Sequence, residues 1–310
     1  MKQLIVSASP HDRDPLPTAH IMFCVILALL PTAVAGCLNF GRSAVLLLMF
    51  TVGTAVLWET GARLLMKKPQ TVGDLSAVVT GLLLGLNLPP DLPLWQAAIG
   101  TFVAIVVVKQ LFGGLGQNFA NPTVVARIVL MVSFTANMTS FRIPHTDAVT
   151  SATPLVSGGA SYWDLFLGNT AGCIGETCAM ALLLGGFYLW LRGIISPAAP
   201  LSFIGSFALC TWLAGNDPLA QVLSGGLMLG AIFMATDYVT VPLTAKGKMV
   251  FGIGCGCLTF VIRQYGGYPE GVSFSILLMN LLTPYIDRFT MTKPFGAVRE
   301  KKAKEVQPNA

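Results

Sequence analysis

The sequence predicts an all-α, polytopic membrane protein with about ten transmembrane helices in two inverted five-helix repeats. Of its 310 residues, 54% are hydrophobic and 11% are charged, whereas soluble proteins carry roughly a quarter charged residues. Apolar runs of the length that crosses a bilayer, about 20 residues, follow one another along the chain. Short glycine-containing patterns recur in both halves. One membrane domain is therefore expected, with no large soluble domain.

In chain order, the apolar runs give ten candidate spans. The third is short and contains Gly81, Gly85 and Asn87 before Pro89, so we expect it to be broken or tilted. The spans lie near residues 20–39, 43–60, 75–89, 94–112, 122–138, 176–192, 199–215, 219–236, 249–265 and 271–287. The chain is therefore expected to have five parts. These are a cytoplasmic N-terminal segment (1–19), a first transmembrane half (20–138), an outer loop (139–175), a second transmembrane half (176–287) and a cytoplasmic basic tail (288–310).

The basic residues orient these spans, because Lys and Arg collect in the short cytoplasmic loops of membrane proteins. With the N-terminus inside, fourteen of the 19 basic residues fall in cytoplasmic segments, and only Arg42, Arg142 and Arg263 fall outside. Lys109 and Arg127 lie at or within spans. Both termini are therefore predicted to be cytoplasmic. The basic tail indicates this topology and contact with anionic lipid rather than with nucleic acid.

The first apolar run ends in Val34–Cys37, which imitates a lipoprotein cleavage site. A long proline-containing segment precedes this run and many spans follow it, so the first helix is expected to be retained. The seven cysteines include no Cys-x-x-Cys pair, and there are only three histidines. The spacing of these residues predicts no disulfide, zinc site or haem site.

The two halves contain a similar sequence pattern, which indicates an internal repeat. Thr80–Gly85 is followed by Gln110–Gly114, and the similar Gly225–Gly230 is followed by Arg263–Gly267. Five spans per half is an odd number, so the halves would be inverted relative to each other, and ligand sites of such proteins lie at the repeat interface. The alternative is that these glycines only mark close helix packing, which is common in membranes.

A polar stretch at Asp147–Pro154 lies between the halves, in the expected outer loop. Thr153 precedes Pro154, and a residue before proline is pushed into extended backbone. Its hydroxyl is therefore expected on exposed, non-helical chain, where a modifying enzyme can reach it. The alternative is an ordinary loop rich in hydroxyl groups.

A second polar stretch, Gly113–Pro122, is too rich in glycine and amides to face lipid, so it should be buried in protein or line a cavity. Its backbone amides and the side chains of Asn118 and Asn121 have the groups needed to hold a flat polar ring. The alternative is a tight turn between helices.

Three carboxylates lie at the ends of spans. Glu176 is expected in the first turn of the sixth span, where it caps the helix or marks an anionic ligand nearby. Asp237 and Glu59 lie near the membrane edge, where ionisable groups are candidates for ion or proton movement, or are simply solvated.

These stretches resemble a known family almost end to end: the D subunit of the Rnf ion-translocating electron transport complex, related to the B subunit of the sodium-pumping NADH:quinone oxidoreductase. The resemblance is carried by Ser9–His11, Gly113–Asn118, Asn121–Pro122, Gly175–Thr177, Phe233–Asp237, Gly266–Gly271, Leu278–Asn280 and Asp287–Arg288.

The resemblance implies a covalent flavin. The family's outer-loop motif is Asp-x-x-(Ser/Thr)-Gly-Ala-Thr, and a flavin transferase joins its last threonine to FMN through a phosphoester. Asp147, Thr150, Ala152 and Thr153 match this motif, and Ser151 stands where glycine is usual. Thr153 is thus the expected attachment residue, on the outer face. A second, non-covalent flavin, riboflavin, is implied between the halves, with the Gly113–Asn121 stretch as a wall.

The function that the resemblance implies is electron relay in a bacterial inner-membrane complex. Such a complex transfers electrons between ferredoxin and NAD and couples them to Na⁺ or H⁺ transport, with iron–sulfur clusters and substrate sites on partner subunits. The alternatives are the B-type subunit of a quinone reductase, which usually has a longer N-terminus, a non-redox transporter built from inverted repeats, and a scaffold for partner subunits. The expected partners are the other subunits, the flavin transferase and the lipid bilayer, without nucleic acid.

Overall fold

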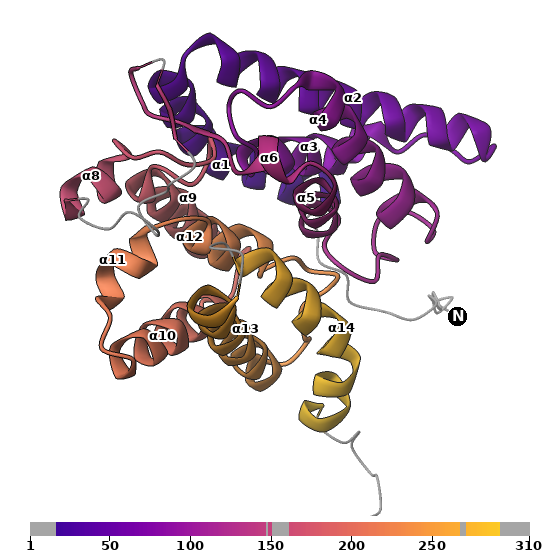
Figure 1. The fold of residues 1–310 in the computed structure, drawn as a ribbon. Helices are drawn as coiled ribbons and strands as arrows, with labels where there is room; N and C mark the ends of the chain where they lie inside the picture. The colour runs from indigo at the N-terminus through magenta and orange to yellow at the C-terminus, as the bar shows by residue number, and fades with distance from the viewer. Residues whose placement is uncertain (1–16, 147, 151–160, 267–270, 292–310) are drawn as a thin grey trace, which may run out of the picture.

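The computed structural model describes residues 17–146, 148–150, 161–266 and 271–291, which are mainly helical (Figure 1). One short antiparallel pair joins β1 (Phe141–Arg142) to β2 (Val149–Thr150). The helical fold class predicted from the sequence is confirmed. Three helices, α1 (Thr18–Phe40), α2 (Arg42–Leu65) and α13 (Ala245–Tyr265), are long and apolar enough to cross a membrane.

The remaining helices are shorter, and α14 (Val272–Thr290), with 19 residues, is the longest of them. Those of the first half are η1 (Val72–Asp74), α3 (Ser76–Leu86), α4 (Leu94–Phe102), the π-helix η2 (Val103–Gln110), α5 (Pro122–Ser133) and α6 (Thr135–Met138). Those that follow are α8 (Tyr162–Leu167), α9 (Ala179–Leu191), α10 (Ala198–Leu213), α11 (Pro218–Leu223), α12 (Leu227–Leu229), the π-helix η3 (Gly230–Met234) and α14 (Val272–Thr290).

Three of the expected spans are not continuous α-helices. The fourth passes from α4 into the π-helix η2. The fifth is divided at Phe134 into α5 and α6. The eighth is divided into α11, α12 and η3, because Ser224 is extended and Gly225 takes a φ of 66°, a conformation that glycine adopts at no steric cost. The third span is short, as expected: α3 has 11 residues.

Local sequence signals explain several helix starts. The side chain of Asn121 accepts a hydrogen bond from the Thr123 amide, with Pro122 at the first position of α5. Asp217 and Pro218 do the same for α11. A side-chain acceptor satisfies an amide that has no partner inside the helix, and proline has no amide proton to leave unpaired.

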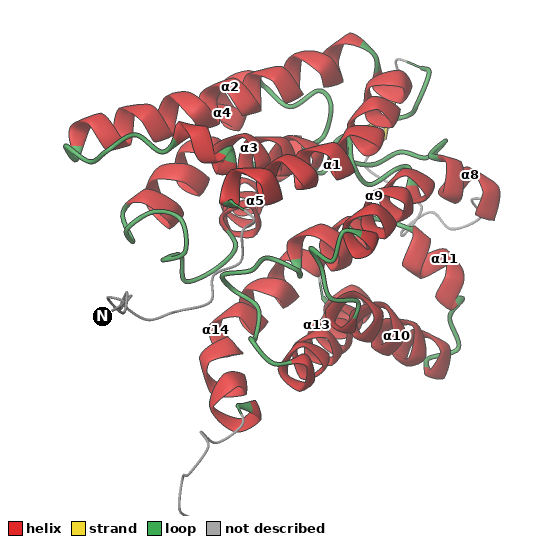
Figure 2. Ribbon diagram, turned by 180° about the vertical axis from the view of Figure 1, so that it is seen from behind, coloured by secondary structure: helices red, strands yellow, loops and turns green. Residues whose placement is uncertain are grey.

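The chain forms two helical groups that meet along their length. In Figures 1 and 2, helices α1 to α6 lie in one group, and α10 to α14 lie in the other, with α9 between them. Within the first group α2 packs on α3 and α4, and within the second α10 packs on α13 and α13 on α14. Across the boundary α1 contacts α9, and α5 contacts α14.

Glycine permits the closest of these approaches. A Cβ at Gly185 in α9 would lie 2.1 Å from the carbonyl oxygen of Ala28 in α1. Without a side chain at that position the two helix backbones can touch, as small residues allow in membrane helix pairs. The two halves are therefore packed directly against each other at this point.

Candidate functional site

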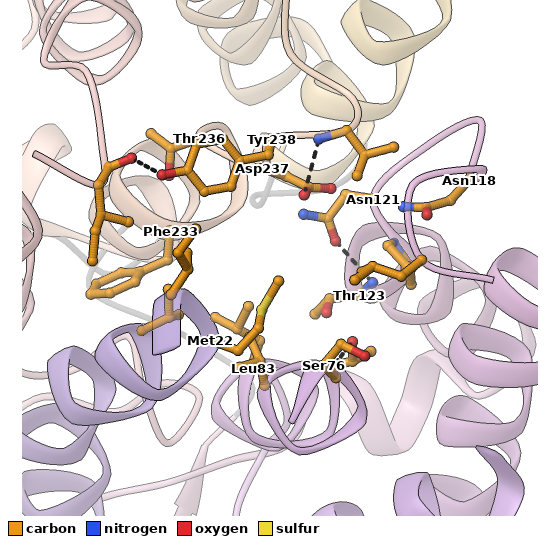
Figure 3. A pocket seen from close by; sticks show the side chains of 18 of the residues that line it. Met22, Ser76, Leu83, Asn118, Asn121, Thr123, Phe233, Thr236, Asp237 and Tyr238 are labelled. Atoms are coloured by element: carbon orange, nitrogen blue, oxygen red, sulfur yellow. Dashed lines mark hydrogen bonds between the residues drawn. The ribbon is translucent and has the colours of Figure 1, made fainter. Parts of the chain in front are cut away.

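A pocket lies between the two halves (Figure 3). Its cavity has a volume of about 100 Å³ and is partly open to solvent. Its walls come from α1, α3, the end of η2, the 115–123 segment, the end of α9 and the segment from η3 to Val239. Segments far apart in the sequence thus meet around one space.

The pocket has an apolar side and a polar side. Met22 and Phe233 line one part of it, while Asn118, Asn121 and Asp237 contribute amides and a carboxylate elsewhere. Figure 3 shows Phe233 across the pocket from Asn118. Such a lining suits a planar ligand with one apolar end and one polar end, because binding sites combine apolar walls with a few placed polar groups.

Both π-helical segments border this pocket. The lining residue Lys109 belongs to η2, and the lining residue Phe233 belongs to η3. The amide of Ala235 donates to the carbonyl of Gly230 at 2.7 Å, which is the five-residue spacing of a π-helix. Single π-turns inside helices occur frequently at functional sites, so their meeting here favours the pocket as the site.

Asn121 ties the halves together. Its Oδ1 accepts from the Thr123 amide at 3.0 Å, and its Nδ2 donates to the carbonyl of Met234, in the other half, at 3.1 Å. Both ends of the side-chain amide are therefore engaged by protein. Asn121 shapes the wall, and since one N–H and one lone pair of its amide are left over by these two bonds, its role in binding a ring stays a prediction.

Asn118 differs from Asn121. Its Nδ2 lies 3.5 Å from the carbonyl oxygen of Ala120, and its buried Oδ1 accepts no hydrogen bond from any residue that the structure describes. A buried acceptor without a donor costs free energy. Asn118 therefore offers an acceptor to a ligand with an N–H or O–H group.

Asp237 follows η3 and lines the pocket. Its carboxylate accepts from the Val239 amide at 3.4 Å and from the Thr240 hydroxyl at 3.2 Å. The next residue, Tyr238, donates its hydroxyl proton to the carbonyl of Ile194. This loop is therefore fixed at the pocket, with the carboxylate against the space.

Glu59 is not solvated, which corrects one alternative from the sequence. It is fully buried, and Lys109 Nζ lies 2.9 and 3.1 Å from its two oxygens. Gln110 Nε2 and the Thr71 hydroxyl also donate to it, at 2.9 and 3.0 Å. The sequence placed Lys109 in an apolar run, and a buried cation there requires an anionic partner, but the spacing alone did not identify Glu59.

Arg127 and Glu176 form a second buried pair, at 2.5 Å between Nη2 and Oε1. Arg127 Nη1 also donates to Asn87 Oδ1 at 2.6 Å. Helix α9 begins at Ala179, so Glu176 lies in the loop before it and not in the first helical turn that the sequence predicted. Neither residue of the pair lines the pocket. The carboxylate joins α5 to the loop that enters the second half.

The outer-loop motif is only partly described. Thr150 lies in β2 opposite Phe141, whereas Asp147, Ser151, Ala152 and Thr153 lie outside the described residues. The predicted attachment site is therefore not tested by the structure.

Two contacts fix the chain on the far side of this motif. The Asn39 side chain donates to the carbonyl of Gly168 at 3.0 Å. The Tyr162 hydroxyl donates to the Asp217 carboxylate, which lowers the pKa of Asp217 and raises that of Tyr162. Helix α8 is thereby attached to the start of α11.

Comparison with known proteins identifies the family. Residues 5–296 match the NQR2, RnfD, RnfE family. The chain belongs to this family. The D subunit of the Na(+)-translocating ferredoxin:NAD(+) oxidoreductase complex of Acetobacterium woodii is 51% identical over 310 aligned residues, covering 96% of this chain and 97% of that protein. The resemblance stated from the sequence is thus confirmed.

Two further relatives extend the comparison. The D subunit of the proton-translocating ferredoxin:NAD(+) oxidoreductase complex of Clostridium ljungdahlii is 44% identical, covering 95% of this chain and 96% of that protein. The D subunit of an ion-translocating oxidoreductase complex of Stutzerimonas stutzeri is 37% identical, covering 89% and 92%. The similarity therefore spans nearly the full length of each relative.

Proposed function

We propose that this chain is the D subunit of an ion-translocating ferredoxin:NAD⁺ oxidoreductase and relays electrons across the membrane within that complex. The observation that supports this most is family membership over residues 5–296, with relatives of this name at 51% and 44% identity. Partner subunits would carry the iron–sulfur clusters and the ferredoxin and NAD sites. The chain would act only as part of the assembly.

The first proposed cofactor is FMN, joined to Thr153 through its phosphate by a flavin transferase. The motif residues Asp147, Thr150, Ala152 and Thr153 support this attachment, and Ser151 replaces the usual glycine with another small residue. A phosphoester leaves the ring free to accept and donate electrons, while the tether prevents loss of the cofactor. The protein contributes position and electrostatics, and the flavin supplies the redox chemistry.

The second proposed cofactor is riboflavin, held without a covalent bond in the pocket between the halves. Support comes from the apolar side at Met22 and Phe233 and from the unpaired acceptor of Asn118. Riboflavin has no phosphate, and Lys109 is the only basic residue among the described residues that line the pocket, already paired with Glu59. The lining therefore fits an uncharged flavin, with Asn121 bracing its wall.

We also propose ten spans in two inverted repeats. The packing has the pattern that a pseudo-twofold axis would produce. The first and sixth spans, α1 and α9, contact each other, as do the fifth and tenth, α5 and α14. Within each half the second span packs on the fourth, α2 on α4 and α10 on α13. The positive-inside bias supports cytoplasmic termini and a Thr153 loop on the outer face.

Two other assignments remain to be separated from this one. A B-type subunit of a quinone reductase would support quinone reduction, and a non-redox transporter would need no flavin. One relative is named as Na⁺-translocating and another as proton-translocating, so the proposed function includes transport of either ion. Comparing transport with and without Na⁺ in the assembled complex distinguishes the two ions.

The proposed function is tested by complementation in a bacterial host that depends on the complex. Membranes lacking this chain should lose ferredoxin-dependent NAD⁺ reduction, and the wild-type chain should restore it. The Thr153→Ala chain should assemble without restoring it, while Thr139→Ala, which changes an outer-loop threonine outside the motif, should behave as wild type. Full activity with Thr153→Ala would overturn the assignment of the electron path.

A further inference from the structure

The buried pair Lys109–Glu59 is oriented toward the pocket. Lys109 and Ser76 line the pocket, and Glu59 does not. Lys109 is 2% exposed and Glu59 is fully buried. Lys109 therefore contributes to the pocket wall, and its ion-pair partner does not.

Hydrogen bonds hold this orientation. Lys109 Nζ donates to Ser76 Oγ at 2.6 Å in addition to both oxygens of Glu59. Ser76 Oγ in turn donates to Asp74 Oδ1 at 2.5 Å. The ammonium group thus has acceptors for its three protons, and its position is fixed before any ligand binds.

Several donors hold Glu59 in place. Its carboxylate accepts hydrogen bonds from Gln110 and Thr71 as well as from Lys109. In a poorly polarisable interior, an ion pair with a fixed direction acts at longer range than it would in water.

The other buried pair in the described chain has no such relation to the pocket. Arg127 and Glu176 are as deeply buried as Lys109 and Glu59, but neither of them is a lining residue. A pair that serves only to join helices has no need to present its cation to an empty space. The placement of Lys109 therefore indicates a role toward whatever occupies the pocket.

We propose that Lys109, positioned by Glu59 and Ser76, sets the redox potential of the flavin in the pocket by holding a fixed positive charge beside the polar end of its ring. This inference rests on the proposed function. Asn118 and Ser76 lie on the polar side and Phe233 lies opposite, as Figure 3 shows. The pyrimidine end of the ring, with its nitrogen and oxygen atoms, matches the first side, and the dimethylbenzene end matches the second.

The effect of Lys109 on the redox potential needs no covalent bond between the flavin and the chain. Electrons enter the ring from one partner subunit and leave to another, so the number gained equals the number lost in each cycle. Each electron adds negative charge to the ring, and a nearby cation stabilises the reduced form more than the oxidised form. Charge close to the ring nitrogens is one of the means by which proteins tune flavins. Lys109 acts as a positioning and electrostatic group.

The test is a redox titration of the full-length chain, purified in detergent and carrying Thr153→Ala so that only non-covalent flavin remains. The main variant is Glu59→Gln with Lys109→Met, which removes both charges together. Removing Lys109 alone would leave an uncompensated buried carboxylate and threaten folding. Lys109→Arg keeps the charge, and Thr211→Val is the matched control, because Thr211 is buried in α10, does not line the pocket, and donates its hydroxyl to the Phe207 carbonyl of its own helix.

The double variant should bind flavin with a midpoint potential shifted below that of the parent chain. Lys109→Arg should stay closer to the parent than the double variant does, and Thr211→Val should match the parent. A double variant that retains flavin at the parent potential would overturn the inference while leaving the pocket as the flavin site. A parent chain that binds no flavin would instead refute the proposed riboflavin site, and this inference with it.

Discussion

Replacing Arg127 with methionine is predicted to destabilise the protein strongly, because it breaks a buried ion pair from one side. Arg127 and Glu176 are each 1% exposed in their side chains, and Arg127 Nη2 lies 2.5 Å from Glu176 Oε1. Arg127 also donates to Asn87 at 2.6 Å. The Arg127→Met variant would leave the Glu176 carboxylate buried beside an apolar side chain.

Removing one partner of a buried pair typically costs about 3–5 kcal/mol, since the remaining charge is uncompensated. For a chain of this size, such a loss corresponds to a fall in Tm on the order of 5–10 °C. The double variant Arg127→Met with Glu176→Gln should recover much of this loss, because it removes both charges of this pair together. The hydrogen bond to Asn87 would still be missing.

The measurement is thermal unfolding of the purified subunit in detergent, followed by the fluorescence of its tryptophans. Arg192→Met is the matched control: Arg192 is an exposed residue at the end of α9, and exposed substitutions usually change stability by less than about 0.5 kcal/mol. An Arg127→Met variant as stable as Arg192→Met would refute the reasoning. So would a double variant no more stable than Arg127→Met alone.

Two further substitutions test the pocket and the electron–ion coupling. Asn118→Ala should lower the amount of non-covalent flavin that co-purifies with the Thr153→Ala chain, because it removes the acceptor at Oδ1; an unchanged flavin content by fluorescence of the denatured extract would exclude Asn118 as a ligand. Asp237→Asn should reduce ion uptake by vesicles that contain the complex more than it reduces NAD⁺ reduction, because the Asp237 carboxylate faces the pocket. Equal wild-type rates of both reactions would remove Asp237 from the coupling mechanism.

The long helices were the most predictable elements. Uninterrupted apolar runs place α1, α2, α13 and α14 within a few residues of the expected spans, since only a helix satisfies every backbone group across a bilayer. The break in the eighth span was missed. Ser224, Gly225 and Gly226 lie inside an otherwise apolar run, and glycine is also common in continuous membrane helices, so composition did not reveal the turn.

The place of the polar stretch was predicted only in part. The sequence indicated that Gly113–Pro122 is buried in protein, lines a cavity or forms a tight turn. Asn118 and Asn121 line the pocket, whereas Gly113, Gly116 and Gln117 are exposed. The sequence did not indicate that the Asn121 side chain would form hydrogen bonds with the backbone of Thr123 and of Met234. The contact with Met234 joins residues more than a hundred positions apart, and its geometry follows from how the halves pack.

The buried ion pairs illustrate the same limit. Lys109 and Arg127 stand out in the sequence as cations at or within spans, and each requires an anionic partner. Four acidic candidates, Glu59, Asp74, Glu176 and Asp237, lie at span ends, and nothing in the spacing assigns one to each cation. The fold makes that choice, by bringing Glu59 to Lys109 and Glu176 to Arg127.

The central claim is that this chain carries a flavin covalently at Thr153, and in-gel flavin fluorescence after denaturation tests it most directly. The chain is produced with an active flavin transferase, beside Thr153→Ala and the Thr139→Ala control. We expect a fluorescent band for the wild-type chain and for Thr139→Ala, and none for Thr153→Ala. A wild-type chain without a band, when a known acceptor protein is labelled in the same cells, would contradict the covalent assignment and favour a non-redox transporter.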